Sequence, residues 1–268
     1  MALRLVTFAD GSLRWRLAGR RLERQAKSSG WFDAIHRWTA QELHQQIPQF
    51  KAENPRLDLS STRGYGYWLW RPYILRAELT SLPPGDSLLF LDAGCQLNIV
   101  PESTRRLHEY IDLVNRDGSL IMQISSTLDQ WCKRDLLDHF VDEAKGHALR
   151  LLEPGTMFLR STESNDALIA EWIRWGQSDG YHYLDDSPSL RPNLPSFSEH
   201  RHDQAILTCL STQHSLGALP QETYFPSGWR SEGARYPIWA LRNSTPVVLE
   251  GNGLLSQAAT RLRHRRHR

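Results

Sequence analysis

Cysteine is scarce in this sequence, and long hydrophobic runs are missing from it. The 268 residues contain three cysteines, which are widely spaced and include no CxxC pair, so a structural zinc site of the usual spacing is excluded. An odd number of cysteines in a chain without an export signal is typical of reduced thiols, and free cysteines usually pack in the core. We therefore expect buried thiols at Cys95, Cys132 and Cys209.

No stretch approaches the roughly 18 consecutive apolar residues that a membrane-spanning helix needs. Residues 1–10 also lack the apolar region of a signal peptide and are more typical of a strand that begins almost at once. These absences predict a cytoplasmic protein, at most peripheral to the inner face of the membrane.

Three motifs of nucleotide-binding and hydrolytic enzymes are also absent. The sequence has no GxxxxGK[ST] and no GxSxG, which excludes a P-loop and a nucleophile elbow. The pair Gly64 and Gly66 lacks a third glycine and follows no strong strand, so it is not a dinucleotide-binding fingerprint.

The net charge of +2 conceals an uneven distribution. The last eight residues hold five arginines, and without them 27 basic side chains stand against 30 acidic ones, a net charge of −3. A short run of like charges is typically disordered. We expect one domain over 1–255 and a basic, disordered tail over 256–268. The tail either aids solubility or makes weak contact with a membrane surface, and a mildly acidic body argues against a specific nucleic-acid partner.

Strand and helix patterns alternate from residue 3 to about residue 130. This alternation predicts an α/β fold with a mostly parallel sheet and helices on both faces. Later in the chain, the pattern predicts a largely helical segment over 133–152, a strand over 155–159 and a proline-rich loop over 178–197 that could cover a site. The clearest earlier elements are strands at 3–8, 87–91 and 119–125, and helices at 13–27, 40–50 and 102–115.

Candidate ligand-binding residues follow two of these strands, because ligands of open α/β sheets bind beyond the carboxyl ends of strands. Phe8 and Asp10 stand at the end of the first strand, and Asp92 directly follows the strand at 87–91. A carboxylate held there could bind a hydrated divalent cation or a ribose hydroxyl, and the next residues, Ala93 and Gly94, would let the backbone approach a ligand. Asp92 could equally cap the following turn.

Aromatic residues are concentrated between residues 65 and 70. Trp68 and Trp70 are more typical of core or wall positions. Tyr65 and Tyr67, which lie beside glycines, are the better candidates for stacking on a base or a sugar.

Three segments in a fixed order resemble a known family. They are Arg63-Gly-Tyr-Gly-Tyr-Trp-Leu-Trp-Arg-Pro72, the strand that ends in Asp92-Ala93-Gly94, and His202-Asp203-Gln204. Together they resemble bacterial GT-A-type glycosyltransferase-like proteins of polysaccharide gene clusters, which read roughly GYGYWxWKP, DAG and HDQ. The resemblance spans about residues 3–210.

The resemblance implies a GT-A-like fold with a mixed, mostly parallel sheet, and a glycosyltransferase of surface polysaccharide synthesis. It also implies a nucleotide-sugar donor, a glycan or lipid-linked acceptor, and often a divalent metal, Mn²⁺ or Mg²⁺. Asp92 would be the first carboxylate of a DxD motif, but Gly94 replaces the second, so the metal site would lack one ligand. Arg71 would neutralise the donor diphosphate. The acceptor side would include Gly155, Thr156, His202 and Gln204.

Glycosyl transfer also needs a group that accepts the proton of the acceptor hydroxyl. Asp203 and Glu199 are our candidates for it, although acidic residues are also common at the start of a helix. The alternative function is a catalytically degenerate protein that binds a nucleotide or a glycan without transfer, which the missing carboxylate at Gly94 would explain.

Overall fold

The computed structural model describes residues 2–60 and 62–241 of the chain, and a six-stranded sheet forms its centre. The strand order is β2-β1-β3-β6-β5-β7. The strands are β1 (Leu3–Phe8), β2 (Ala34–Trp38), β3 (Ser87–Leu91), β5 (Ser119–Thr127), β6 (Arg150–Arg160) and β7 (Ala218–Pro220).

The sheet is mixed and mostly parallel. β1 runs parallel to both β2 and β3, and β5 runs parallel to β7, whereas β6 is antiparallel to β3 and to β5. The predicted fold class is confirmed at the level of an α/β fold with a mixed, mostly parallel sheet that helices flank, and the GT-A-like assignment stays a prediction. The prediction of a largely helical segment up to residue 152 was wrong at its end, because β6 already begins at Arg150 and pairs with strands on both sides.

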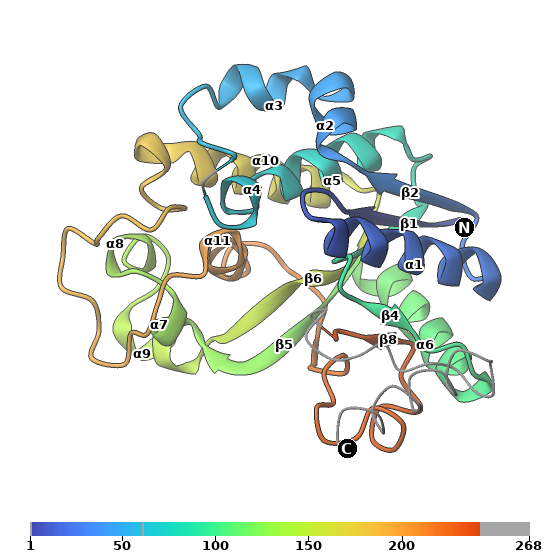
Figure 1. Cartoon of the computed structure of the whole chain (residues 1–268). Coiled ribbons are helices and arrows are strands. Elements are labelled where there is room, and N and C mark those ends of the chain that lie inside the picture. The colour runs from blue at the N-terminus through green and yellow to red at the C-terminus, as the bar shows by residue number, and fades with distance from the viewer. Residues whose placement is uncertain (1, 61, 242–268) are drawn as a thin grey trace, which may run out of the picture.

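Helices cover both faces of the sheet (Figure 1). Side chains of a strand alternate between faces, so Leu89 and Leu91 of β3 pack with α1 and α6 while Leu88 and Phe90 pack with α5, α10 and α11. These helices are α1 (Leu13–Ser29), α6 (Pro101–Asp117), α5 (Trp70–Ser81), α10 (Glu163–Gln177) and α11 (His202–Leu210).

Shorter elements connect this framework. The predicted helix over 40–50 is divided into two, because Pro48 cannot continue the hydrogen-bond ladder of the first and instead opens the second. The shorter elements are α2 (Ala40–Gln46), α3 (Pro48–Glu53), α4 (Gly64–Tyr67), α7 (Leu128–Trp131), α8 (Arg134–Leu137), α9 (Glu143–Ala148), η1 (Ser178–Tyr181), β4 (Gln96–Leu97) and β8 (Ile238–Trp239).

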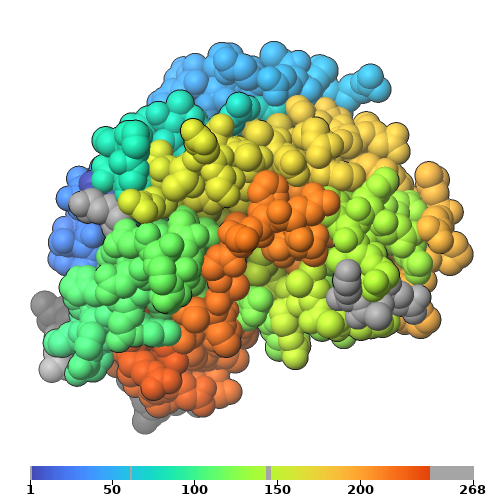
Figure 2. Space-filling model, turned by 180° about the vertical axis from the view of Figure 1, so that it is seen from behind, coloured from blue at the N-terminus to red at the C-terminus, as the bar shows by residue number. Residues whose placement is uncertain are grey.

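The segment that follows α11 crosses the back of the molecule, where it is orange in Figure 2, and reaches α6, which is green. It is fixed there by Glu222, whose carboxylate accepts hydrogen bonds from Arg106 at 2.7 Å and from Tyr110 at 2.6 Å. Further on, β8 pairs with β4 in a separate two-stranded sheet. The segment thus packs against the α6 side of the molecule.

Two expectations from composition can be compared with the structure. All three thiols are free and buried, as predicted. Within the described ranges, no helix combines the length and the apolar character needed to cross a bilayer. The expected basic tail over 256–268 lies outside the described residues.

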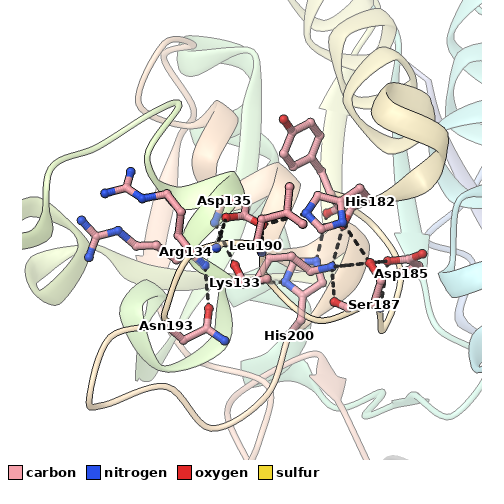
Figure 3. Close-up of polar contacts among 12 residues, drawn as sticks. Lys133, Arg134, Asp135, His182, Asp185, Ser187, Leu190, Asn193 and His200 are labelled. Atoms are coloured by element: carbon pink, nitrogen blue, oxygen red, sulfur yellow. Dashed lines mark hydrogen bonds and ion pairs between the residues drawn. The ribbon is translucent and has the colours of Figure 1, made fainter.

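The proline-rich loop is held down by one buried lysine (Figure 3). Lys133, whose side chain is 2% exposed, donates from Nζ to the carbonyl oxygens of His182, at 2.6 Å, and Ser187, at 2.8 Å. It also pairs with Asp185 at 3.3 Å. A buried ammonium group loses its hydrogen bonds with water and has to form equivalent ones within the protein. The contacts of Lys133 therefore anchor this loop to the start of α8.

Asp135 fixes a second part of the same loop. Its carboxylate accepts hydrogen bonds from His182 Nε2, at 2.7 Å, and from the backbone N–H groups of Leu190 and Arg191. Burial opposes ionisation of this carboxyl, but the hydrogen bonds outweigh it and lower the pKa of Asp135 to about 2. The charged form is therefore the one that stabilises the fold.

This pKa predicts a pH-dependent contribution to stability. Asp135→Asn should lower the free energy of unfolding by about 2 kcal/mol at pH 7. The lowered pKa means that the contribution is present above the ordinary pKa of about 3.9 and is lost as the pH falls toward 2. Urea unfolding of both proteins at several pH values measures the difference. Asp112→Asn, on the exposed side of α6, is the control, and a difference that stays constant down to pH 2.5 would contradict the assignment.

Candidate functional site

The carboxyl ends of β1 and β3 lie side by side, because the two strands are parallel neighbours with Val6 opposite Phe90. Asp92 follows β3, and Arg71 in the first turn of α5 points to it with Nη2 3.2 Å from Asp92 Oδ1. The other side of the guanidinium forms an ion pair with Asp203, in the first turn of α11. The structure therefore brings together three of the residues predicted from sequence.

Arg71 is buried at this junction, with 3% of its side chain exposed. Its guanidinium lies 5.3 Å from the ring centre of Trp70 and 5.4 Å from that of Phe90, which places a cation over two aromatic rings. Burial lowers the pKa of Arg71, and the neighbouring Asp92 carboxylate opposes this effect. One guanidinium thus pairs with two carboxylates, so the triad of Arg71, Asp92 and Asp203 has a net negative formal charge.

The two carboxylates differ in access to solvent. Asp203 is 4% exposed, whereas Asp92 is 47% exposed. The Asp203 main-chain oxygen also accepts a hydrogen bond from the indole of Trp172, at 3.1 Å. The role of Asp203 as the proton acceptor stays a prediction, and its carboxylate is enclosed with Arg71. Asp92 is the member of the triad that a ligand can reach.

Gly155 of β6 lies directly against Asp92. A Cβ at position 155 would stand 2.5 Å from Asp92 Oδ2, and the Asp92 backbone N–H donates to the Gly155 carbonyl at 2.9 Å. Gly155 thus shapes the position of the carboxylate, and its expected place on the acceptor side is next to Asp92. Thr156 is buried, at 1% exposure, and its expected contact with an acceptor stays a prediction.

The residues after Asp92 are buried, which differs from the expectation that their backbone faces a ligand. Ala93 packs with Ala9 and Ala18, and Gly94 is buried beside it. Arg21 of α1 donates to the Cys95 carbonyl at 2.7 Å. The segment is therefore held from the α1 side and exposes the carboxylate of Asp92 instead of its own main chain.

The aromatic block forms a left-handed turn. Five successive residues have positive φ, namely Gly64, Tyr65, Gly66, Tyr67 and Trp68, with values between 52° and 85°. Glycine adopts this conformation freely, but each L-residue with a side chain costs about 1–2 kcal/mol. Three non-glycine residues therefore cost roughly 3–6 kcal/mol in total. Strain of this kind is concentrated at functional sites in proteins.

The rings of this block form a wall beside the triad. Phe8 stacks on Trp70 with ring centres 4.2 Å apart and lies 6.0 Å from Tyr65. The Tyr65 hydroxyl is 2.9 Å from Nε2 of His44. Burial and the charge of Asp10 raise the pKa of Tyr65, so its hydroxyl stays protonated at neutral pH and can serve as a hydrogen-bond donor.

Asp10 has a structural role in addition to its place at the strand end. Its two oxygens accept hydrogen bonds from the backbone N–H groups of Gly11, at 2.6 Å, and Ala40, at 2.7 Å. It therefore fixes the start of α2 relative to β1. The predicted contact of Asp10 with a donor has to compete with both of these hydrogen bonds.

His202 packs against the left-handed aromatic turn. It is 1% exposed, and its ring lies 4.8 Å from that of Tyr67. Its Nδ1 contacts the Leu184 carbonyl at 2.8 Å, and burial lowers its pKa. Gln204, two residues on, donates to the Leu152 carbonyl at 2.6 Å. Both residues were expected on the acceptor side, but the structure places them in the support of the site.

Glu199 lies at the exposed rim. Its carboxylate is 3.4 Å from Nη1 of Arg63 and 3.0 Å from Nη2 of Arg201. Its side chain is 40% exposed, and Arg63 directly precedes the left-handed turn. Glu199 therefore remains accessible to an acceptor, unlike Asp203.

Sequence reasoning missed a buried carboxylate near the site. Glu153 of β6 accepts a hydrogen bond from the Thr223 hydroxyl at 2.7 Å. Burial raises the pKa of the Cys95 thiol, and the charges of Asp92 and Glu153 raise it further. The only signal in the sequence is the Glu-Pro-Gly that precedes Thr156.

The expected metal can be compared with the side chains present. Among the described residues, no group of three or more His, Cys, Asp or Glu side chains could hold a metal ion. A cation bound by protein ligands alone therefore does not fit. Asp92 could provide one oxygen to a hydrated cation whose other ligands belong to a bound phosphate, which is the usual way in which Mg²⁺ is held.

A separate hollow of about 870 Å³ lies between the start of α6 and the C-terminal segment. None of the site residues predicted from sequence contributes to it. Its lining includes Asn98, Phe225, Arg235, Tyr236 and Trp239.

The unequal burial of the two carboxylates predicts unequal effects on stability. Asp203→Ala should lower the free energy of unfolding by about 3–5 kcal/mol, because it leaves a buried guanidinium with one exposed partner. Asp92→Asn should cost less than about 1 kcal/mol, because the pair it weakens is half exposed. Chemical denaturation of the two variants measures both values. Equal costs would show that Asp92, too, serves mainly to hold the fold.

No protein-family model matches the sequence, and no curated protein matches it. Among solved structures, mouse xyloside xylosyltransferase 1 in its apo form is similar at 13% identity, with 92% of this chain and 100% of that chain covered and a TM-score of 0.49. A glycosyltransferase involved in glycosylation of the major capsid of PBCV-1 has 8% identity, coverage of 91% and 95%, and a TM-score of 0.48. The apo-form glycosyltransferase GlyE of Streptococcus pneumoniae has 12% identity, coverage of 96% and 59%, and a TM-score of 0.46. With TM-scores below 0.5, these likenesses leave the function to be argued from the side chains of the site.

Proposed function

We propose that this protein is a glycosyltransferase that takes a sugar from a nucleotide-sugar donor bound at the carboxyl ends of β1 and β3. The observation that carries the proposal is the exposed carboxylate of Asp92, which a buried Arg71 holds in place at that edge. Open α/β sheets bind ligands at this edge. The family resemblance of the aromatic block, the DAG segment and the HDQ segment supports the same assignment.

In this proposal, Asp92 binds the donor and Arg71 positions Asp92. The guanidinium is buried and its two Nη atoms pair with Asp92 and Asp203, so in this proposal it does not itself neutralise the diphosphate, the role that the sequence predicted. Its fixed geometry instead prevents Asp92 from rotating away from the edge, and Gly155 leaves room for that orientation. The carboxylate can then accept hydrogen bonds from hydroxyl groups of the donor.

The left-handed turn supplies the flat surface of the site. Tyr65 lies half buried beside Phe8, with its hydroxyl near the entrance to the strand ends. Flat aromatic faces suit both the bases and the sugar rings of a nucleotide sugar. The strain in the turn gives these rings one fixed orientation, which lowers the entropic cost of binding a donor.

Loss of the leaving nucleoside diphosphate requires a positive charge near its phosphates. Asp92 and the donor's own phosphates would hold a divalent cation, Mn²⁺ or Mg²⁺, which would supply that charge when bound. Arg63 and Arg201 are exposed cations at the rim, and both pair with Glu199.

We assign the role of proton acceptor for the acceptor hydroxyl to Glu199. It is the carboxylate of the predicted pair that remains exposed, and it lies next to the turn through its ion pair with Arg63. A carboxylate within reach of the acceptor can remove the proton as the new bond forms. The acceptor in this proposal is a glycan or a lipid-linked sugar of surface polysaccharide synthesis, a role that rests on the family resemblance.

The proposal predicts nucleotide release from a donor. The protein should release nucleotide from one of a panel of UDP-, GDP- and CMP-sugars, tested with Mn²⁺, Mg²⁺ and a chelator. Asp92→Asn should lower the rate about 100-fold or more, since removal of one preorganised contact to a reacting ligand typically costs this much. Asp112→Asn on α6 is the matched control, and its rate should equal that of the unchanged protein.

Glu199→Gln tests the acceptor side of the site separately from the donor side. It should lower transfer to an acceptor while leaving the affinity for the donor unchanged, as measured by isothermal calorimetry. Donor binding without nucleotide release under any condition would instead identify the degenerate binding protein that Gly94 suggests. If no donor binds at all, the proposed function is wrong.

A further inference from the structure

The first two turns of α1 expose large apolar side chains. Leu13 is 63% exposed, Trp15 40% and Leu17 51%. Within residues 2–60 and 62–241, the large hydrophobic side chains of this exposure number six, and three of them lie within these five positions. The other three, Val100, Leu190 and Tyr224, are scattered. Single exposed apolar residues are ordinary, but Leu13 and Leu17 lie one turn apart on the same side of α1, whereas Trp15 projects from the other side of the helix. Two neighbouring exposed leucines call for a partner.

The exposed side of α1 is also basic. Leu13, Leu17, Arg20 and Arg24 follow each other at intervals of four, three and four residues, so they form one stripe along the helix. The opposite stripe, with Ala18, Leu22 and Ala26, is buried against the sheet. Arg16, Arg20 and Arg24 are all exposed. The outer face thus combines apolar groups at its beginning with arginines along its length.

The acidic side chain of the helix does not neutralise this face. Glu23 forms ion pairs with Lys27, at 2.7 Å, and with Arg37 of β2, at 3.0 Å. Arg21 is turned inward, since it donates to the Cys95 carbonyl. The exposed arginines therefore leave an excess of positive charge beside the exposed leucines.

We propose that the outer face of α1 is a docking surface for an anionic lipid bilayer. A helix of this kind lies in the plane of the interface, with Leu13 and Leu17 entering the boundary between headgroups and acyl chains. Arginines beside them are attracted to the negative surface of the leaflet. A purely electrostatic partner such as a nucleic acid would explain the arginines but not the leucines, so a bilayer fits both observations.

The docking surface lies next to the candidate site. Leu13 follows Asp10 by three residues, and α1 begins where β1 ends (Figure 1). Arg21 of the same helix fixes the segment after Asp92. A chain resting on this face would therefore hold the carboxyl edge of β1 and β3 close to the lipid surface. The surface itself does not depend on the proposed glycosyltransferase activity.

Vesicle flotation of the full chain tests the proposal. The protein should float with vesicles of equal parts phosphatidylglycerol and phosphatidylcholine, and not with phosphatidylcholine alone. Arg20→Gln with Arg24→Gln should weaken binding about 25-fold, because each arginine near an anionic surface contributes about fivefold. Leu13→Ser with Leu17→Ser should weaken it roughly tenfold. Circular dichroism verifies that these surface changes leave the helix content intact.

Matched controls separate α1 from the rest of the chain. Arg105→Gln with Arg116→Gln, two exposed arginines of α6, should bind as the unchanged protein does. Deletion of residues 261–268 should leave binding sensitive to the α1 changes.

Two results would overturn the proposal. One is a loss of vesicle binding on deletion of residues 261–268 alone, with the α1 variants binding normally, which would transfer the contact to the C-terminal arginines. The other is binding that depends on Arg20 and Arg24 but not on Leu13 and Leu17, which would identify a general polyanion surface. Donor turnover in solution is a separate measurement, so failure of one proposal is distinguishable from failure of the other.

Discussion

A buried guanidinium is the constraint on which this site depends. Arg71 lies below the carboxyl ends of two parallel strands, where no water can replace a lost partner. Its charge has to be balanced by Asp203 from one helix and Asp92 from a strand end. These ion pairs thereby join α5, α11 and the end of β3 at one point. Because one of the two carboxylates faces solvent, the same interaction that secures the fold also presents a chemical group to a ligand.

The strained turn and the buried triad support each other. The left-handed backbone around Tyr65 and Tyr67 is costly, and it persists because its rings pack on Phe8 and His202. His202 immediately precedes Asp203, whose carboxylate holds Arg71. Backbone strain, aromatic packing and the ion pair therefore belong to one connected structure. A site of this type is rigid, and rigidity suits the recognition of a ligand whose base, sugar and phosphates must all be placed.

The sequence predicted well what local patterns determine. The strand at 87–91 and the exposed carboxylate after it follow from a short apolar run and a single aspartate. Pairing between Arg71 and Asp203 could not be predicted, because the residues are 132 positions apart and no periodicity links them. The burial of Asp203 could not be predicted for the same reason, since it depends on the pair with Arg71 of α5. The antiparallel direction of β6 and the contacts of Lys133 with the proline-rich loop likewise depend on distant segments that only the folded chain brings together.

The separation of these residues along the chain has a consequence for synthesis. Arg71 leaves the ribosome long before Asp203, and at about 5–20 residues per second the interval is on the order of ten seconds. During that time the guanidinium has no enclosed partner and must stay hydrated, so the edge of β1 and β3 cannot close over it. The nascent chain therefore carries an incomplete candidate site. Completion of α11 acts as the final step of assembly, and truncated products are expected to be devoid of the site.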